Sequence, residues 1–388
     1  MHPPGPVLAV VPSSVEHVLL LLGSFALLLA GAEIFTNGVE WLGHRLGISE
    51  SATGSILAAV GTALPETMIP VIAILQAVMG SGSQAAADEV GVGAILGAPF
   101  MLATIAMFMV GASVLYFRDR RSFGAEMHFN ADSTRRDLSF FLVGYTLAFV
   151  AALVPVESVS LAIGVVLVLL YVAYVYRSLK AGGLMDDEGL DELHLGEVVD
   201  RVASPTPFVG ETRAQANDPH LVLVVGQALL ALGIIITGAH VFVGEVQWAA
   251  QEVLHVPAAV IALLLAPLAT ELPEKFNSII WISRDSDTLA LGNITGAMAF
   301  QGTLPVTLGI LFTSWNLTLE WGTAGFLNAF SVVLALVSGV ILYLRARNAG
   351  EGNMNPRPFL LGGAFYALFI VVLLYHVMAF DLAVSGGH

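Results

Sequence analysis

The chain has 388 residues, of which 56% are hydrophobic and only 12% are charged, a composition that excludes an ordinary soluble protein. Much of the formal net charge of −15 lies in one hydrophilic segment, so it does not indicate a basic partner, and no nucleic-acid partner is expected. Cysteine is absent, which excludes disulfides, thiolate metal sites and thiol nucleophiles.

Apolar stretches long enough to cross a bilayer recur along the whole chain. We predict ten transmembrane helices, over residues 15–40, 50–79, 89–115, 138–153, 157–179, 220–250, 256–282, 288–313, 323–345 and 358–380. Clusters of Gly, Pro, Asn or Ser bound several of them, as expected for turns at a membrane surface. The predicted fold class is therefore an all-α polytopic membrane protein.

The basic residues alternate between the predicted connections. Of the 15 Lys and Arg residues, 14 lie in or beside the connections that follow the first, third, fifth, seventh and ninth spans. By the positive-inside rule these connections are cytoplasmic, and both termini of this multi-pass cell-membrane protein are extracytoplasmic. Lys275, inside the seventh span, is the exception.

The two halves of the chain resemble each other. Gly31 matches Gly238 and Trp41 matches Trp248 at an offset of 207, and a Leu-Pro-Glu motif recurs at an offset of 208. Glycines after the two motifs match at an offset of 199, because the second copy has a shorter loop. Each copy has five spans, an odd number, so the second copy enters the membrane from the opposite side and the repeat is inverted.

The resulting domains are a first five-helix repeat (1–179), an acidic cytoplasmic linker (180–218) and a second five-helix inverted repeat (219–388). The linker carries seven acids from Asp186 to Asp200. An EF-hand calcium loop over this stretch fails, because Leu190 would stand at a ligand position and Asp191 at the turn glycine. A solvated linker is the favoured interpretation, and a regulatory cation sensor is the alternative.

Two short motifs carry the candidate chemistry. The sequence Thr-x-Leu-Pro-Glu begins at Thr62 and Thr270 and ends at Glu66 and Glu274. A carboxylate is costly inside a membrane, and a helix-breaking proline weakens nearby backbone hydrogen bonds, so that carbonyls seek another partner. Two carboxylates, two hydroxyls and several carbonyls form an all-oxygen shell that suits Ca²⁺. The alternative is an ordinary kink in each helix, with each glutamate hydrogen-bonded to a neighbouring helix.

With these motifs the chain resembles the calcium/cation antiporter superfamily, whose sodium/calcium exchangers carry Gly-Thr-Ser-Leu-Pro-Glu in both halves. The ten spans, the loop after the fifth span and the inverted repeat extend the resemblance along nearly the whole chain. The resemblance implies that Glu66 and Glu274 bind a calcium ion, with Thr62 and Thr270 beside them. It also implies alternating access, in which the slanted first and sixth spans slide against the core.

The span after each motif departs from the family pattern Gly-Asn-x-x-Gly-Ser-Asn, which is followed by Asn or Asp. Ala98, Leu102 and Ala297 stand where the family has polar residues. Asn293 and Gln301 keep a polar side chain and are candidates for a coupling-ion or proton site. Most side-chain oxygens that the resemblance assigns to sodium are therefore missing, but the calcium carboxylates remain.

Four further ionisable residues are candidates for a coupling-ion or proton site. Glu271 and Lys275 stand at i and i+4 on one helix face, which favours a neutralised pair. Alternatively, the Lys275 ammonium takes the place of a coupling ion, or Glu271 carries a proton. Glu33 and His240 occupy matching repeat positions, where a hydrogen bond between helices is favoured over a proton-linked role.

The leading functional hypothesis is a secondary antiporter that exchanges Ca²⁺ for Na⁺ by alternating access. The alternatives are an exchanger of Ca²⁺ or another divalent cation for H⁺, and a cation-binding homologue that does not transport. Inorganic cations and the lipid bilayer are the expected partners, and no covalently bound cofactor is expected. An enzyme is not expected, since the sequence has no nucleotide-binding loop and no Ser-His-Asp arrangement.

Overall fold

The structure, a computed structural model, describes residues 13–46, 63–80, 87–154, 156–180, 191–203, 217–254, 272–315, 317–350 and 352–379, together with Ile56, Gln84 and Leu263. This part of the chain is helical apart from one short two-stranded sheet. Within these described residues, eight helical segments are long and apolar enough to cross a membrane, which confirms a polytopic membrane protein. They are Val15–Phe35, Val92–Phe117, Ala131–Leu153, Glu157–Lys180, Leu221–Val246, Asp287–Phe312, Ala324–Arg347 and Arg357–Ala379.

The elements in chain order are α1 (Ser13–Arg45), α4 (Leu64–Val78), η2 (Ala87–Gly91), α6 (Val92–Met101), η3 (Leu102–Ala106), α7 (Met107–Phe117), β1 (Met127–His128), α8 (Ala131–Leu153), α9 (Glu157–Lys180), α10 (His194–Ala203), α11 (Leu221–Trp248), η4 (Ala249–Leu254), α13 (Leu272–Ser283), α14 (Asp287–Gln301), α15 (Leu304–Phe312), α16 (Ala324–Arg347), β2 (Asn353–Met354), η5 (Arg357–Phe359) and α17 (Leu360–Ala379). The expected spans 50–79 and 256–282 contain α4 and α13, and most of the residues before these two helices lie outside the described part. The count of ten helices and the inverted repeat therefore stay predictions.

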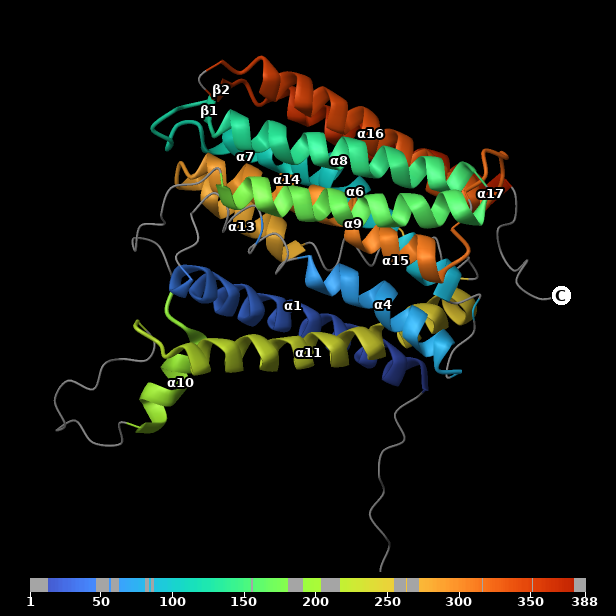
Figure 1. Ribbon diagram of the computed structural model, residues 1–388, viewed down its shortest axis with the longest axis horizontal. Coiled ribbons are helices and arrows are strands. Elements are labelled where there is room, and N and C mark those ends of the chain that lie inside the picture. The colour runs from blue at the N-terminus through green and yellow to red at the C-terminus, as the bar shows by residue number, and fades with distance from the viewer. Residues whose placement is uncertain are drawn as a thin grey trace, which may run out of the picture.

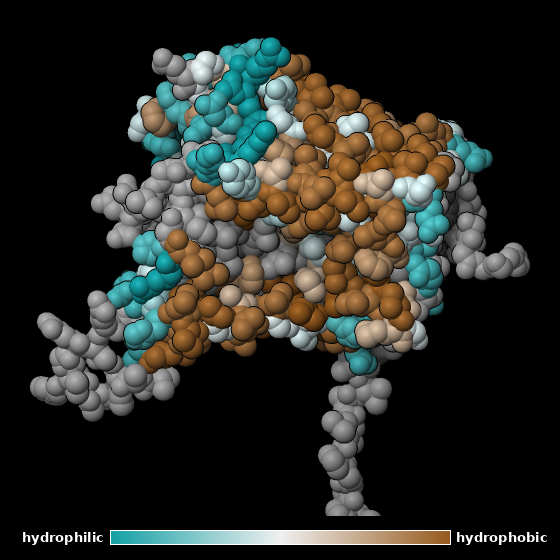
Figure 2. Space-filling view, in the orientation of Figure 1, coloured by the Kyte–Doolittle hydropathy of each residue, from teal (hydrophilic) through white to brown (hydrophobic). Residues whose placement is uncertain are grey.

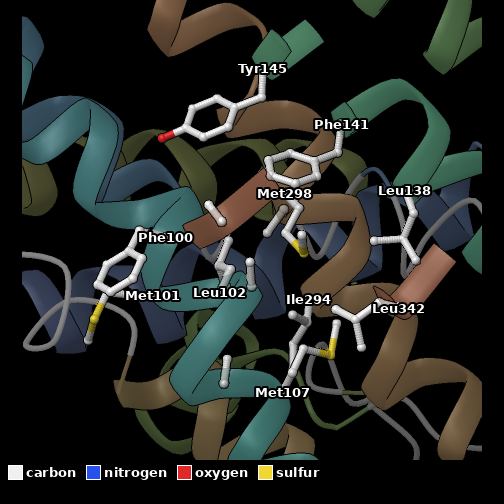
Figure 3. Packing of buried hydrophobic residues seen from close by; sticks show 14 of the residues in the cluster. Phe100, Met101, Leu102, Met107, Leu138, Phe141, Tyr145, Ile294, Met298 and Leu342 are labelled. Carbon is white, nitrogen blue, oxygen red and sulfur yellow. The ribbon is translucent and has the colours of Figure 1, made fainter. Parts of the chain in front are cut away.

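The helices form two groups, which we call the helix pair and the bundle. The helix pair consists of α1 and α11, which pack along each other on one side of the molecule, with α4 against α11 (Figure 1). The bundle on the other side contains α6–α9 and α13–α17. Its centre is apolar: Phe100, Phe141, Tyr145 and Met298, from α6, α8 and α14, are fully buried in one cluster (Figure 3).

Contacts inside the helix pair are reciprocal. A Cβ added to Gly31 would lie 2.8 Å from Ile235 Cγ1, and one added to Gly238 would lie 3.2 Å from Leu28 Cγ. At the offset of 207, Gly31 matches Gly238 and Leu28 matches Ile235, so each contact repeats the other. Glycine leaves room for this close approach at both places, as in other membrane helix pairs.

The contacts at the two ends of the helix pair also repeat each other at the offset of 207. The ring of His17 stacks on Trp248, with 4.3 Å between centroids, and Trp41 packs with Val224 in a buried cluster. At the offset of 207, His17 matches Val224 and Trp41 matches Trp248. A two-fold relation between α1 and α11 accounts for both sets of contacts, because an isologous interface uses each contact twice.

Three connections meet at one end of the bundle. Arg121, after α7, forms two hydrogen bonds to Asp287 at the start of α14, of 2.8 and 2.7 Å, and both side chains are fully buried. The N–H of His128 donates to the same carboxylate, and β1 pairs with β2 from the connection between α16 and η5. A charge pair buried and hydrogen-bonded in this way fixes the geometry of the connections that share it.

The surface agrees with a membrane environment. Figure 2 shows a broad apolar belt across the middle of the molecule, with hydrophilic patches towards its left and right ends. Leucines and valines of α9 and α11, such as Leu169 and Leu229, are exposed. Such a surface would be a liability in water, but it matches the hydrocarbon layer of a bilayer.

Candidate functional site

Both Leu-Pro-Glu motifs begin a helix. α4 starts at Leu64 and α13 at Leu272, so each motif glutamate is the third residue of its helix. Proline in a first helical turn costs no hydrogen bond, because the amide it lacks has no partner within the helix. The first turn also presents unpaired N–H groups and the positive end of the helix dipole, which favour a carboxylate.

Thr67, the fourth residue of α4, closes the first turn of this helix. The N–H and the hydroxyl of Thr67 both donate to the carbonyl of Ala63, at 3.2 and 2.8 Å. The side chains of Glu66 and Glu274 lie outside the described part of the chain, as do Thr62, Thr270 and Glu271. Their assignment as cation ligands therefore stays a prediction.

Each motif helix packs against the span that follows it. α4 contacts η2 and α6, and α13 contacts α14, where the hydroxyl of Ser278 donates to the carbonyl of Ala290. α4 also contacts α15 from the second half of the chain. In the view of Figure 1, α4 begins near the centre of the molecule, below α13.

A small cavity joins the first turn of α4 to the end of α14. Its volume is about 10 Å³, room for one water-sized occupant. The residues that line it are Thr67, Ala94, Ile95, Ala98, Gln301 and Pro305. Residues from both halves of the chain thus meet beside the position of Glu66.

Gln301 is a buried polar residue of this cavity. Its side chain is 1% exposed, and among the described residues neither its amide oxygen nor its amide nitrogen has a hydrogen-bond partner. A buried, unsatisfied amide costs about 1–3 kcal/mol, so its retention needs an explanation. An oxygen ligand for a cation or for a bound water is one such explanation.

The three apolar residues that stand where the family has polar residues, Ala98, Leu102 and Ala297, are buried in the structure. Ala98 lines the cavity, whereas Leu102 lies in the apolar cluster of the bundle with Met298 (Figure 3). Ala297 belongs to the same cluster. The first half therefore supplies no side-chain ligand at these positions.

Two further predicted residues are buried near this region. Lys275 is 1% exposed in the second turn of α13, and Asn293 is fully buried in α14. The predicted pair of Lys275 with Glu271 stays a prediction, because Glu271 is outside the described residues.

Glu33 and His240 lie elsewhere. Both side chains are exposed on the helix pair, and neither lines the cavity. The amide nitrogen of Gln76 in α4 lies 3.2 Å from Nδ1 of His240. The structure thus gives His240 a contact between helices, as the favoured interpretation of the sequence expects.

The sequence analysis does not single out Asp137, a buried acid of α8. Its carboxylate is fully buried, accepts a hydrogen bond of 2.9 Å from the Thr295 hydroxyl of α14, and lies 3.2 Å from Nη2 of Arg136. Asp137 stands one residue before the predicted span 138–153, whereas α8 begins at Ala131. Its position next to the edge of a predicted span is a signal that it could lie within the helix. An acid buried within a membrane helix is a functional candidate.

Among the side chains that the structure describes, no group of three or more His, Cys, Asp or Glu residues could hold a metal ion. The predicted calcium ligands Glu66 and Glu274 have side chains outside the described residues, so this result does not bear on them.

A sequence profile of the family "Sodium/calcium exchanger protein" matches residues 16–180 and 223–378. An uncharacterized membrane protein of Methanocaldococcus jannaschii is 23% identical over 355 residues, which cover 91% of this chain and 95% of that protein. The crystal structure of the H⁺/Ca²⁺ exchanger CAX is similar, with a TM-score of 0.61 and 16% identity over 95% of this chain and 90% of that one. The sodium-calcium exchanger NCX_Mj, soaked with zero Na⁺ and Ca²⁺, gives a TM-score of 0.56 and 19% identity over 92% of this chain and 99% of that one. At these identities the two structures establish a shared fold.

Proposed function

The chain belongs to the sodium/calcium exchanger protein family, and on that premise we propose that it is a secondary antiporter that moves Ca²⁺ across a cell membrane in exchange for a second cation. The observation that carries the proposal is the cavity between α4 and α14. It is lined by Thr67, the residue that follows the glutamate of one motif, and by Gln301 from the other half of the chain, whose amide has no hydrogen-bond partner among the described residues. A transporter site at a repeat interface, formed by helix termini at membrane depth, has this arrangement.

In this proposal Glu66 and Glu274 share one calcium ion. Two carboxylates match the charge of a divalent cation, and the ion offsets the cost of placing both inside a membrane. The hydroxyls of Thr62 and Thr270 complete the oxygen shell, because each precedes its glutamate by about one helical turn.

The coupling ion in this proposal is Na⁺, held by Gln301 and backbone carbonyls. The competing candidate is H⁺, and a specific observation favours it: Ala98, Leu102 and Ala297 are buried without any polar atom in their side chains. A carboxylate can take either a sodium ion or a proton, whereas an apolar side chain can take neither.

The proposed topology has ten helices in two inverted repeats, with both termini extracytoplasmic and the linker cytoplasmic. The reciprocal contacts of α1 and α11 support the inversion, since they repeat at the offset of the sequence repeat. The meeting of the connections after α7, α13 and α16 at one end of the bundle supports their placement on one side of the membrane.

The test is calcium flux in proteoliposomes that contain the purified chain, with a sodium gradient and a proton gradient imposed separately. We expect calcium uptake driven by the sodium gradient at clamped pH. Uptake driven by the pH gradient alone would establish proton coupling instead. Calcium binding without flux under either gradient would contradict antiport and identify a cation-binding homologue.

A further inference from the structure

Part of the linker is bound to the helix pair. Residues 191–193 run across the ends of α1 and α11, and α10 follows them and contacts both helices. The indole N–H of Trp41 donates to the carbonyl of Asp191 at 2.9 Å, and the amide of Asn37 donates to the carbonyl of Glu192 at 3.2 Å. The sequence predicted a solvated linker here and gave no sign of this docking.

The linker both accepts hydrogen bonds from the helix pair and donates hydrogen bonds to it. The N–H of His194 donates to the side-chain oxygen of Asn37, and the N–H of Leu195 donates to that of Gln227 in α11. Gln227 in turn donates to Asn37 across the helix pair, at 2.8 Å. Gln227 and Asn37 are both buried, so these bonds are protected from water.

Apolar packing adds to the bonds. Leu193 of the linker is fully buried against Trp41 of α1 and Val224 of α11. A buried leucine next to backbone groups that are hydrogen-bonded on both sides is a docked segment, not a solvated one. We call this docked segment, residues 191–195, the clasp.

The clasp shortens one of the connections between the bundle and the helix pair. α9 of the bundle ends at Lys180, and α11 begins at Leu221, so 40 residues separate these two helices along the chain. With the clasp docked, only the ten residues 181–190 remain between them. Ten residues span at most about 36 Å, whereas 40 residues could span about 130 Å or more.

We propose that the clasp is a conformational regulator that tethers the helix pair to the bundle. The proposal rests on the proposed antiport, in which the helix pair moves relative to the bundle. A short tether restricts such a movement and favours the arrangement in which the docked segment and Lys180 are close. Release of the clasp therefore shifts the population between the two access states, without any change in the cation ligands.

The first test compares two variants of the linker in oriented proteoliposomes. Leu193→Asp places a charge in the buried contact, and Val198→Asp places the same charge on α10 where the side chain is 54% exposed. For Leu193→Asp we expect the calcium concentration at half-maximal exchange to rise on one face of the membrane and to fall on the other. The shift should be about fivefold or more, the factor that one typical net hydrogen bond is worth. Val198→Asp should match the unmodified protein on both faces.

The second test separates the tether from the docking. An insertion of about 20 Gly and Ser residues between residues 185 and 186 lengthens the connection between α9 and the clasp and changes no residue of the clasp. We expect it to reproduce the opposite shifts of Leu193→Asp. Active exchange with unchanged half-saturation on both faces, in either variant, would overturn the proposal.

A third measurement does not depend on transport. The natural chain has no cysteine, so a spin label at Lys180→Cys and another at Leu46→Cys, beyond the end of α1, report one distance without background labelling. The distance distribution should broaden in Leu193→Asp and stay narrow in Val198→Asp. Equal distributions would overturn the tether, whereas a lack of calcium exchange in the unmodified protein would overturn the antiport and leave this distance readout intact.

Discussion

The segments α6–η3–α7 and α14–α15 occupy matching places in the sequence repeat, but their backbones differ where Leu102 matches Gln301. In the first segment the helix continues through Leu102, and residues 102–106 form one π-helical turn. In the second segment α14 ends at Gln301, the chain turns at Gly302 and Thr303, and α15 begins at Leu304. Pro305, in the first turn of α15, favours a new helix over a continued one.

One bond is common to both segments. The hydroxyl of Thr104 donates to the carbonyl of Phe100 at 2.6 Å, and that of Thr303 donates to the carbonyl of Ala299 at 2.8 Å. Thr104 and Thr303 match at the offset of 199. The two copies have thus kept the same bond from a threonine hydroxyl to a carbonyl, although their backbones differ beside it.

The difference assigns separate tasks to the two segments. Leu102 packs in the apolar centre of the bundle, whereas Gln301 lines the cavity beside the first motif helix. The break after Gln301 places this amide at a helix end instead of inside a continuous helix. At this matched position the second half contributes polar chemistry to the proposed site, and the first half contributes packing.

The largest expected effect tests whether the two motifs remain equivalent although these segments have diverged. Glu66→Gln and Glu274→Gln should each reduce calcium exchange by about 100-fold or more, because an uncompensated charge in a buried site costs about 3–5 kcal/mol. Initial calcium uptake in proteoliposomes measures this, with Glu320→Gln, at an exposed position, as the control. Normal uptake in either purified, monodisperse motif variant would show that its glutamate is not a calcium ligand.

The next effect concerns the divergent position itself. Gln301→Leu should weaken the response to the coupling ion by about tenfold, since a polar contact to a charged group contributes about 1.5–3 kcal/mol. The same change should raise thermal stability, because it removes an unsatisfied amide from a buried cavity. Ion titration of calcium flux and thermal unfolding in detergent measure the two effects.

The reverse substitution, Leu102→Gln, sharpens the comparison. It buries a new amide in the apolar cluster and should lower stability by about 1–3 kcal/mol, with no gain in coupling. A stronger coupling response in this variant would mean that position 102 does face the ion path.

A smaller effect concerns how α8 holds the two segments. Asp137 of α8 accepts a hydrogen bond from the side-chain hydroxyl of Thr295 in α14. Tyr145 of α8 donates its hydroxyl to a backbone group of α6, the Leu96 carbonyl, at 3.2 Å. Thr295→Val should cost about 1–3 kcal/mol, since it deprives a buried carboxylate of a donor. Tyr145→Phe should cost about 1 kcal/mol. Thermal unfolding of the two variants side by side measures this order, and a larger loss in Tyr145→Phe would reverse it.

The smallest effect is at the end where the two segments meet. Burial alone would raise the pKa of Asp285, but hydrogen bonds from Ser122 and the charge of Arg121 outweigh it, so the pKa lies below the usual 3.8. A carboxyl group with a lowered pKa stabilises the folded protein above about pH 4, and this contribution disappears as the pH falls through the lowered pKa. Asp285→Asn should therefore lower the unfolding temperature slightly at pH 7 and less at pH 4. An equal loss at both pH values would assign the effect to packing.

The sequence predicts the long apolar helices well because hydropathy alone identifies them. The predicted spans 15–40 and 157–179, for example, lie within α1 and α9, and the spans 323–345 and 358–380 each extend one residue beyond α16 and the segment η5–α17. Gln301 was also singled out in advance, because the family pattern places a polar residue there. Its burial and lack of a partner depend on how α4, α6 and α14 pack, and no local pattern carries that information.

Other features depend on partners far away in the chain. α10 is short and polar, so hydropathy does not reveal it, and the clasp becomes visible only when Asn37, Trp41 and Gln227 are brought to the linker. The turn after Gln301 lies within the single predicted span 288–313, although Gly302 and Pro305 were available as signals. Asp137 was missed because the predicted start of its span was seven residues too late.

The buried pair of Arg121 and Asp287 sets an order for the making of this protein. The two residues are 166 positions apart, so Arg121 leaves the ribosome on the order of ten to thirty seconds before its partner, at about 5–20 residues per second. During that interval the guanidinium cannot enter its final place, because an unpaired charge there is strongly unfavourable. The connection after α7 therefore has to wait, open to water, until the beginning of α14 has been synthesised. The first half therefore completes its folding at this connection only after the start of α14 in the second half has been translated.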